Sequence, residues 1–224
     1  YSLTQLQQAR TRLGDSPSYR YVAADVYHLP FVPGLFDGAT MIRTLHHMTD
    51  ARRALEGVRR VLQTNAIFIL EFANKQNLKA IVRYLFRRQK WNPFSPEPVE
   101  FAALNFDFHP ATVRTWLQVS GFAVQRKLTV SHFRMGLLKR IFPANFLARL
   151  DGLAQLAGDA WQLSPSVFVR TQAVGDTPPA EAGNFFRCPA CGHAPLPDTS
   201  PEIICPACNW HYPVVDGIYD LRLQ

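Results

Sequence analysis

Apolar residues recur along the first 175 residues with two different spacings, one typical of helices and one typical of strands. The helical spacing occurs in residues 1–14 and again in residues 48–62, where Thr49 or Asp50 can cap the helix. The apolar face of this second helix is predicted to consist of Ala54, Leu55, Val58, Val61 and Leu62. Strands are predicted to end at Asp25 and to cover residues 36–42 and 66–72. The last strand is continuously apolar, which is typical of a parallel strand covered on both faces.

The same two spacings alternate in the second half of this region. Residues 109–121 predict a helix with Pro110 in its first turn and Gly121 as its stop, and residues 122–130 and 165–172 predict strands. Residues 134–161 have apolar side chains at helical spacing, interrupted at Pro143. Because strands alternate with helices, we expect an α/β, doubly wound domain with a mostly parallel sheet over residues 1–175.

The charge of the chain changes sign near residue 175. Residues 1–175 carry 22 basic and 11 acidic side chains, whereas residues 176–224 carry two basic and six acidic ones; the whole chain has a formal net charge of +7. Residues 176–184 are rich in proline, glycine and alanine and are predicted to be a linker. We therefore expect a small separate module at residues 185–224.

This module contains all four cysteines of the chain, Cys188, Cys191, Cys205 and Cys208, as two C-x-x-C pairs. Four thiolates at this spacing match a tetrahedral zinc site. Gly192 and Asn209, which follow the pairs, are the residue types that most easily adopt the positive φ of a tight metal-binding turn. Two disulfides or a thioredoxin-like redox pair are weaker alternatives, because the chain resembles a cytosolic protein and neither pair has a βαβ context. Four protein ligands would close the metal shell, so the predicted role is structural.

After the cysteines, the string W-H-Y-P-V-V-D-G-I-Y-D-L predicts a hairpin with its turn at Asp216-Gly217. Residues 186–221, with C-P-A-C-G and Y-P-V-V-D-G-I, resemble the small zinc-ribbon activator protein that partners several RNA and protein methyltransferases. The resemblance departs at Tyr219-Asp220, where a proline-containing ending is usual. Since the ribbon is acidic, it would repel phosphate, and we expect it to dock on the basic body of this chain or on a partner protein.

A second resemblance comes from the order of motifs in the basic region: D-V-Y-H-L-P-F, F-D-G-A-T-M-I-R-T-L-H-H-M-T-D and A-L-E-G-V-R-R-V-L, followed by an apolar strand. This order resembles class I S-adenosylmethionine-dependent methyltransferases of the ubiquinone/menaquinone-biosynthesis type, over residues 1–74 and more loosely over residues 109–172. It implies an S-adenosylmethionine cofactor and in-line transfer of a methyl group to an O, N or C nucleophile of a small molecule or RNA. The alternative is a non-catalytic zinc-ribbon interaction protein with a degenerate methyltransferase domain.

The resemblance implies cofactor contacts at both ends of the nucleoside. Asp25, at the end of its strand, would accept a hydrogen bond from the adenine amino group, and Val26 would offer its backbone N–H to the same ring. Ser2 and Gln5 follow the position of the acid that normally binds the ribose, and Gln5 would lie near the nucleoside. The alternative is that Asp25 only ends the strand or caps a turn.

The methionine end and the substrate involve a different segment. Arg43 and Leu45 would flank the methionine part of the cofactor. His47 would lie near the methyl-transfer site as a substrate contact, although a packed loop histidine is equally consistent with the sequence. A metal site at His46-His47 has little support, because adjacent residues on a helix face different ways and no third ligand is evident.

Two features depart from the family pattern. The glycine-rich loop and the ribose-binding acid would precede Tyr1, so we expect residues 1–224 alone to lack the middle of the sheet and to bind the cofactor poorly. In addition, Gln63-Thr64-Asn65 replaces the usual Lys-Pro-Gly-Gly, which predicts only an altered turn before the strand at residues 66–72.

One predicted helix face is basic. Lys79, Arg83 and Arg87 recur every four residues and are interleaved with apolar side chains. This face fits RNA phosphates, an anionic substrate, a membrane surface or simply solvent next to the acidic tail. No apolar run has the length of a spanning helix and no leader pattern opens the chain, so we expect a cytoplasmic protein with a small-molecule substrate, RNA being the second option.

Overall fold

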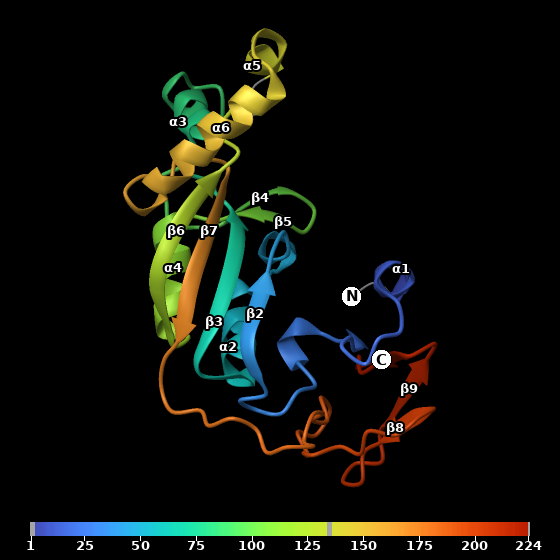
Figure 1. Ribbon diagram of the computed structural model, residues 1–224. Coiled ribbons are helices and arrows are strands. Elements are labelled where there is room, and N and C mark those ends of the chain that lie inside the picture. Colours follow the sequence, from blue (N-terminus) through green and yellow to red (C-terminus); the bar gives the residue numbers. More distant parts are fainter. Residues whose placement is uncertain (1–2, 134–135, 224) are drawn as a thin grey trace. The chain divides into compact units, whose positions relative to one another are not determined.

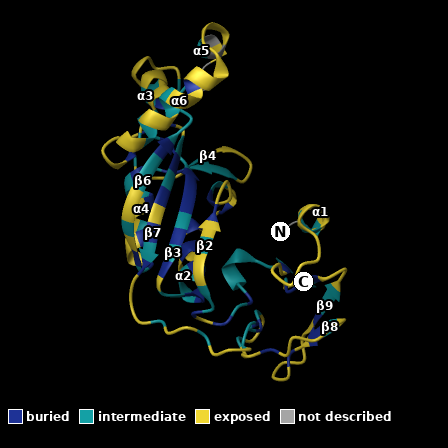
Figure 2. Cartoon of the chain, viewed as in Figure 1, coloured by how far each residue is buried: buried dark blue, intermediate teal, exposed yellow. Residues whose placement is uncertain are grey.

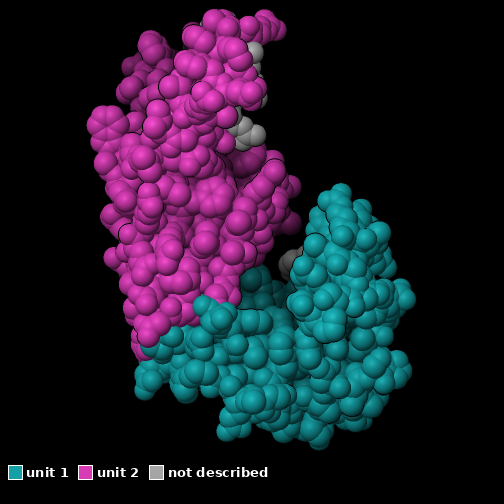
Figure 3. All heavy atoms as spheres, in the orientation of Figure 1, with its two compact units in different colours: residues 1–37, 57–64, 176–224 teal, residues 38–56, 65–175 magenta. Residues whose placement is uncertain are grey.

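The computed structural model describes residues 3–133 and 136–223, except the side chains of residues 137 and 139 (Figure 1). It contains two compact units. Unit 1 comprises residues 1–37, 57–64 and 176–224, and unit 2 comprises residues 38–56 and 65–175 (Figure 3). Ser2, which we predicted to be near the cofactor, lies outside the described residues. The division into residues 1–175, 176–184 and 185–224 stays a prediction.

Unit 1 contains helix α1 (Leu3–Leu13), strand β1 (Tyr21–Ala23) and the 3-10 turn η1 (Val26–His28) from the beginning of the chain. From its end come β8 (Glu202–Ile204), β9 (His211–Val215) and β10 (Ile218–Asp220). These strands form one sheet in the order β1-β10-β9-β8. β1 is parallel to β10, whereas β10 with β9 and β8 with β9 are antiparallel. The cysteine module therefore shares a sheet with a strand of the basic region, as expected for docking on that region.

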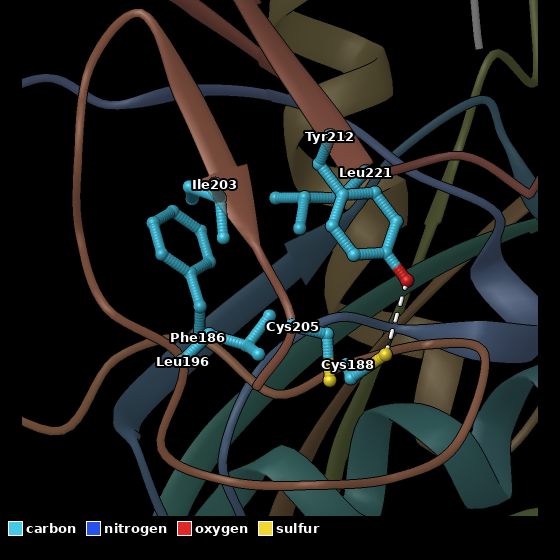
Figure 4. Packing of buried hydrophobic residues seen from close by; sticks show 7 residues of the cluster. All are labelled: Phe186, Cys188, Leu196, Ile203, Cys205, Tyr212 and Leu221. Atoms are coloured by element: carbon cyan, nitrogen blue, oxygen red, sulfur yellow. Dashed lines mark hydrogen bonds between the residues drawn. The ribbon is translucent and has the colours of Figure 1, made fainter. Parts of the chain in front are cut away.

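The core of unit 1 joins residues from both ends of the chain. Its fully buried members include Phe186, Leu196 and Ile203, which pack with the ring of Tyr212 and with Leu221 (Figure 4). Val22 of β1 and Phe31 of the following loop pack against this cluster, and further backbone bonds run from Leu221 N–H to the Ala23 carbonyl and from Arg187 N–H to the Pro30 carbonyl. The ribbon core is thus completed by residues of the basic region.

The predicted linker is held by hydrogen bonds. Thr64 donates its backbone N–H to the Thr177 carbonyl over 2.9 Å, and Thr177 donates its own N–H to the Thr64 hydroxyl over 2.8 Å. Gly34 has a φ of +67°, and a Cβ added there would lie 2.0 Å from the carbonyl oxygen of Pro178. Only glycine therefore allows residues 177–180 to run along this loop.

Unit 2 is built around β3 (Leu62–Ala73), β6 (Phe122–Val130) and β7 (Ser166–Ala173), with β2 (Phe36–Met41) next to β3. Its sheet has the order β2-β3-β7-β6. The other elements are η2 (Leu45–His47), α2 (Ala51–Val61), α3 (Leu78–Leu85), the hairpin of β4 (Val99–Ala102) and β5 (Asn105–Asp107), α4 (Pro110–Val119), α5 (Gly136–Ile141), α6 (Ala144–Gln155) and η3 (Leu156–Asp159). Along the chain, β2, α2 and β3 pass from one unit into the other.

The expectation of a mostly parallel sheet is wrong, because the sheets are mixed. β7 is antiparallel to both of its neighbours, β3 and β6, and β4 and β5 form an antiparallel hairpin. The apolar residues of β3 are buried mainly on one face: Phe68, Leu70 and Phe72 alternate along the strand and are all buried, whereas Ile67 and Ile69 on the opposite face are half-buried. The expected burial on both faces is therefore only partly met. Burial of this kind does not require parallel neighbours, so the apolar run could not determine strand direction.

Several local predictions are confirmed. Asp50 accepts the backbone N–H of Arg53 at the start of α2. All five predicted apolar residues are buried, although the last of them, Leu62, is the first residue of β3. Pro143 separates α5 from α6, and Asp216 and Gly217 have φ values of +50° and +68° in the turn between β9 and β10. The predicted turn at residues 63–65 is wrong. These residues belong to β3, and Asn65 adopts a φ of +67° within the strand.

Among the described residues, no helix combines the length and the apolar character needed to cross a bilayer.

Candidate functional site

The four cysteines come together at one place in unit 1. Their sulfur atoms all lie within 4.8 Å of one another. The sulfurs of Cys188 and Cys208 are 3.7 Å apart, and those of Cys191 and Cys205 are 3.6 Å apart. Four sulfurs at about 2.3 Å from a central zinc would be separated by about 3.8 Å, so the arrangement fits a tetrahedral ion. All four are free thiols.

Each C-x-x-C pair forms the same kind of turn. Gly192 donates its backbone N–H to the Cys188 carbonyl and Asn209 donates to the Cys205 carbonyl, both over 2.9 Å. Gly192 has a φ of +80° and Asn209 a φ of +56°. The residue types that follow the two pairs thus give the turn the positive φ we predicted, which brings the sulfurs of each pair together.

The charges of the cluster favour a bound cation. Burial alone would raise the pKa of Cys188. The Tyr212 hydroxyl, 3.1 Å from the Cys188 sulfur, and the backbone N–H groups of Cys191 and Ala190 have the larger, opposite effect and lower the pKa to about 6 (Figure 4). At Cys208, the backbone N–H of Trp210 acts to lower the pKa, but burial and the neighbouring sulfurs raise it to about 12. One thiolate is therefore stable, and further thiolates need a positive charge among them.

A second group of candidate residues in unit 1 follows β1. Asp25 is half-buried and caps η1: one carboxylate oxygen accepts the backbone N–H of Tyr27, and the other lies 3.0 Å from Nδ1 of His28. A carboxylate has about four acceptor positions, so this cap leaves Asp25 able to accept a further hydrogen bond. The backbone N–H of Val26, directly after it, has no hydrogen-bond partner within the part of the chain that the structure describes. An acceptor beside a free donor is what the amino group and ring nitrogen of adenine require.

The residues predicted for the other end of the cofactor belong to unit 2. Arg43 has an exposed side chain and a φ of +54°, and its backbone N–H donates to the Glu71 carboxylate over 2.7 Å. Leu45 is completely buried, so its side chain packs in the interior. His47 is exposed and its Nδ1 lies 3.0 Å from the Leu104 carbonyl, the hydrogen bond of a packed loop histidine. The rings of His46 and His47 are 4.0 Å apart, and burial lowers the pKa of His46.

The predicted cofactor residues are therefore not all in one unit. Gln5, Asp25 and Val26 belong to unit 1, and Gln5 is exposed on α1. Arg43, Leu45 and His47 belong to unit 2. The roles assigned to these residues stay predictions.

Unit 2 also contains a buried polar group that sequence analysis missed. The side chain of Lys75, which directly follows β3 and Asn74, is fully buried and donates to the Ser95 hydroxyl over 3.0 Å and to the Glu97 carbonyl over 2.5 Å. Burial raises the pKa of Asp107 to about 6 although Lys75 opposes this. Glu71, inside β3, accepts a hydrogen bond from the hydroxyl of Ser166. The signal was present in the string L-E-F-A-N-K, where charged residues interrupt and follow an apolar strand.

Comparison with known families and structures defines the class of the protein. Residues 1–70 match the model of a methyltransferase domain, and residues 184–217 match the model of Trm112p-like proteins. The chain therefore carries a class I S-adenosylmethionine-dependent methyltransferase domain together with a C-terminal Trm112p-like region that contains the four-cysteine cluster.

The curated relatives are quinone-type methyltransferases. The 2-phytyl-1,4-naphtoquinone methyltransferases of Trichormus variabilis and Nostoc sp. are 38% and 37% identical to this chain over 81 residues. The match covers 34% of this chain and 35% of each relative, so the chain spans about a third of the length of the curated relatives it matches.

Solved structures agree on the fold. A putative S-adenosylmethionine-dependent methyltransferase from Listeria monocytogenes covers 78% of this chain, and 77% of its own length, with a TM-score of 0.52 at 13% identity. A complex between the Haloferax volcanii Trm112 methyltransferase activator and a putative methyltransferase gives a TM-score of 0.51 at 13% identity, with 78% of this chain and 70% of that chain covered. At these identities the likeness shows the fold alone.

Proposed function

We propose that this protein is an S-adenosylmethionine-dependent methyltransferase whose acceptor is a small molecule. The observation that carries the proposal is the pair of Asp25 and Val26: a half-buried carboxylate beside an unused backbone N–H, in the segment that matches the methyltransferase domain. The relatives are 2-phytyl-1,4-naphtoquinone methyltransferases, which supports a small apolar acceptor.

In this proposal the chain's own residues position the cofactor. Asp25 would accept from the adenine amino group and Val26 N–H would donate to the ring. The contacts of Arg43 and Leu45 with the methionine part stay predictions from the sequence. Bound S-adenosylmethionine would supply an electrophilic methyl group. The protein's contribution is then to orient the acceptor in line with it and to exclude water. His47, the exposed last residue of η2, would contact the acceptor.

The cysteine cluster is proposed to hold a structural zinc ion. All four ligands would come from the protein, which leaves no open position for a substrate. Because the ribbon core is completed by β1 and the loop after it, the metal would stabilise the segment that carries Asp25.

The test is transfer of radiolabelled methyl groups from S-adenosylmethionine by the complete gene product added to an extract of its own cells. We expect the label in the fraction soluble in organic solvent, and its loss in Asp25→Asn. Label in acid-precipitated RNA would replace the small-molecule acceptor by RNA. Absence of any methyl transfer, together with absence of cofactor binding, would favour the alternative of a non-catalytic zinc-ribbon interaction protein.

A further inference from the structure

Helix α3 exposes an apolar stripe. Leu78, Val82 and Leu85 lie at positions i, i+4 and i+7, and their side chains are 56%, 43% and 68% exposed. Phe86, directly after the helix, is 72% exposed, whereas Ala80 is the buried residue of α3. An amphipathic helix on a protein surface normally turns such a stripe toward the core. In α3 the stripe faces outward.

A second exposed apolar stripe runs from the junction of α5 and α6 through α6 to η3. The rings of Phe142, at the junction, and Phe146 stack with centroids 5.4 Å apart, and Leu153 of α6 and Leu156 of η3 are 69% and 62% exposed. Leu147, on another face of α6, is buried. Leu147 therefore packs inward, whereas most of α6 is exposed (yellow in Figure 2).

The two stripes lie at the same end of unit 2. The first residue of α3, Leu78, donates its backbone N–H to the Leu163 carbonyl over 2.8 Å, and Asn74 donates its side-chain amide to the Gln162 carbonyl over 2.7 Å. These bonds join the start of α3 to the segment that follows η3, where Trp161 is 70% exposed. Figure 1 shows α3, α5 and α6 together beyond the ends of β6 and β7. A gathering of exposed apolar side chains on this scale marks an interaction surface.

Exposed cations lie on the same segments as these apolar side chains. Lys79, Arg83, Arg87, Arg88 and Arg149 are all exposed. None of them forms an ion pair with a described carboxylate. The acids on the same segments are engaged elsewhere: Asp151 binds His132, and Asp159 accepts the backbone N–H of Lys127.

We propose that α3, α5, α6 and Trp161 form a docking surface for an anionic lipid bilayer. An outward apolar stripe flanked by Lys and Arg, with an exposed Trp nearby, is the composition of helices that lie in the plane of a membrane interface. The charge opposes a symmetric dimer on this face, because it would bring the cations of two copies together. RNA would pair with the cations and could stack on the exposed aromatic rings, but it leaves the aliphatic side chains of Leu78, Val82, Leu85 and Leu153 without a partner.

The test is sedimentation of the 224-residue chain with vesicles of phosphatidylcholine, with and without phosphatidylglycerol. We expect binding that requires phosphatidylglycerol and weakens with salt. Leu85→Asp should reduce the partition coefficient about tenfold or more, and Arg83→Glu about fivefold or more. The matched controls are on α1: Leu13→Asp, which is also the last residue of its helix and 53% exposed, and Arg12→Glu. Both controls should bind like the parent.

Three results would overturn the proposal. One is the absence of binding to phosphatidylglycerol vesicles at low salt. The second is an equal loss of binding in Leu85→Asp and Leu13→Asp. The third is a dimer in sedimentation equilibrium that dissociates in Leu85→Asp, together with no vesicle binding by either the parent or the variant. Because every substituted side chain is exposed, circular dichroism should be unchanged, and loss of binding cannot be attributed to unfolding.

Discussion

Val22 of β1 and Tyr219 of β10 face each other in a parallel ladder, although they lie near opposite ends of the chain. Val22 and Tyr219 also both pack against the buried cluster that contains Cys188 and Cys205. The strand that precedes Asp25 is therefore stabilised by the cysteine ribbon. If the ribbon depends on a metal, the order of β1 must depend on it too.

The first prediction concerns this dependence. Removing the metal with a chelator should greatly increase amide hydrogen exchange in β1, which contains no cysteine, as well as in β9 and β10. Exchange in β3 and β7 of unit 2 should change little, because their ladder involves no residue of the ribbon. Mass-resolved exchange before and after chelation measures both. Protection of β1 that persists after verified metal loss would contradict the coupling.

The second prediction concerns Tyr212. Its hydroxyl is 3.1 Å from the Cys188 sulfur and helps to lower the pKa of that thiol. Tyr212→Phe removes this bond, so acid should displace the metal more easily, with the midpoint of release raised by up to about one pH unit. A chromogenic zinc indicator follows the release. Tyr219→Phe is the control, since Tyr219 hydrogen-bonds Asp198 and not a cysteine. Identical curves for the two variants would refute the role of the hydroxyl.

The third prediction concerns Arg60 at the end of α2. Its guanidinium donates to the Phe31 carbonyl over 2.8 Å and to the Leu29 carbonyl over 2.7 Å, and burial lowers its pKa. Arg60→Ala leaves both carbonyls without this partner and should reduce the free energy of unfolding by about 2–3 kcal/mol. Arg52→Ala on the same helix removes only an exposed pair with Glu56 and should cost less than about 0.5 kcal/mol. Denaturant unfolding compares them, and equal losses would count against the loop contact.

The fourth prediction concerns the pH dependence caused by Asp107. Burial raises its pKa from 3.8 to about 6, so the folded state keeps a proton that the unfolded chain releases between these values. Its contribution to stability is therefore greatest below the lower value and declines as pH rises through about 6. Because the side chain is partly exposed, the full effect should be about 1–2 kcal/mol.

Asp107→Asn tests this directly. Relative to the parent, the variant should gain stability between about pH 4.5 and about pH 7.5, because it loses no proton in that range. Asp37→Asn, at an exposed position of β2, is the matched control for replacing an aspartate by asparagine. A constant difference between Asp107→Asn and the parent would show that Asp107 ionises normally in the folded protein.

Local signals in the sequence were sufficient to predict most elements. Asp50 as a cap, Gly121 as a helix stop, Pro143 as a break and Asp216-Gly217 as a hairpin turn each act through their own backbone geometry, which neighbours in sequence determine. The cysteine cluster was predictable for the same reason, since spacing within each C-x-x-C pair fixes the turn.

Long-range pairing was not predictable in this way. The parallel pairing of β1 with β10 and the antiparallel pairing of β7 on both sides depend on which strands meet, and an apolar run contains no information on its partner's direction. The burial of Lys75 was missed because a lysine after a strand normally extends into solvent, and its acceptors, Ser95 and the Glu97 carbonyl, come from a later loop.

Calorimetric titration of S-adenosylmethionine into the complete gene product, as parent, Asp25→Asn and Asp37→Asn, tests the central claim most directly. Asparagine keeps an oxygen to cap η1 but replaces the second acceptor oxygen by an N–H donor, which opposes the adenine amino group. We predict one site per chain in the parent and in Asp37→Asn, and an affinity about tenfold or more lower in Asp25→Asn. Absence of binding in the parent, or unchanged affinity in Asp25→Asn, would contradict the account.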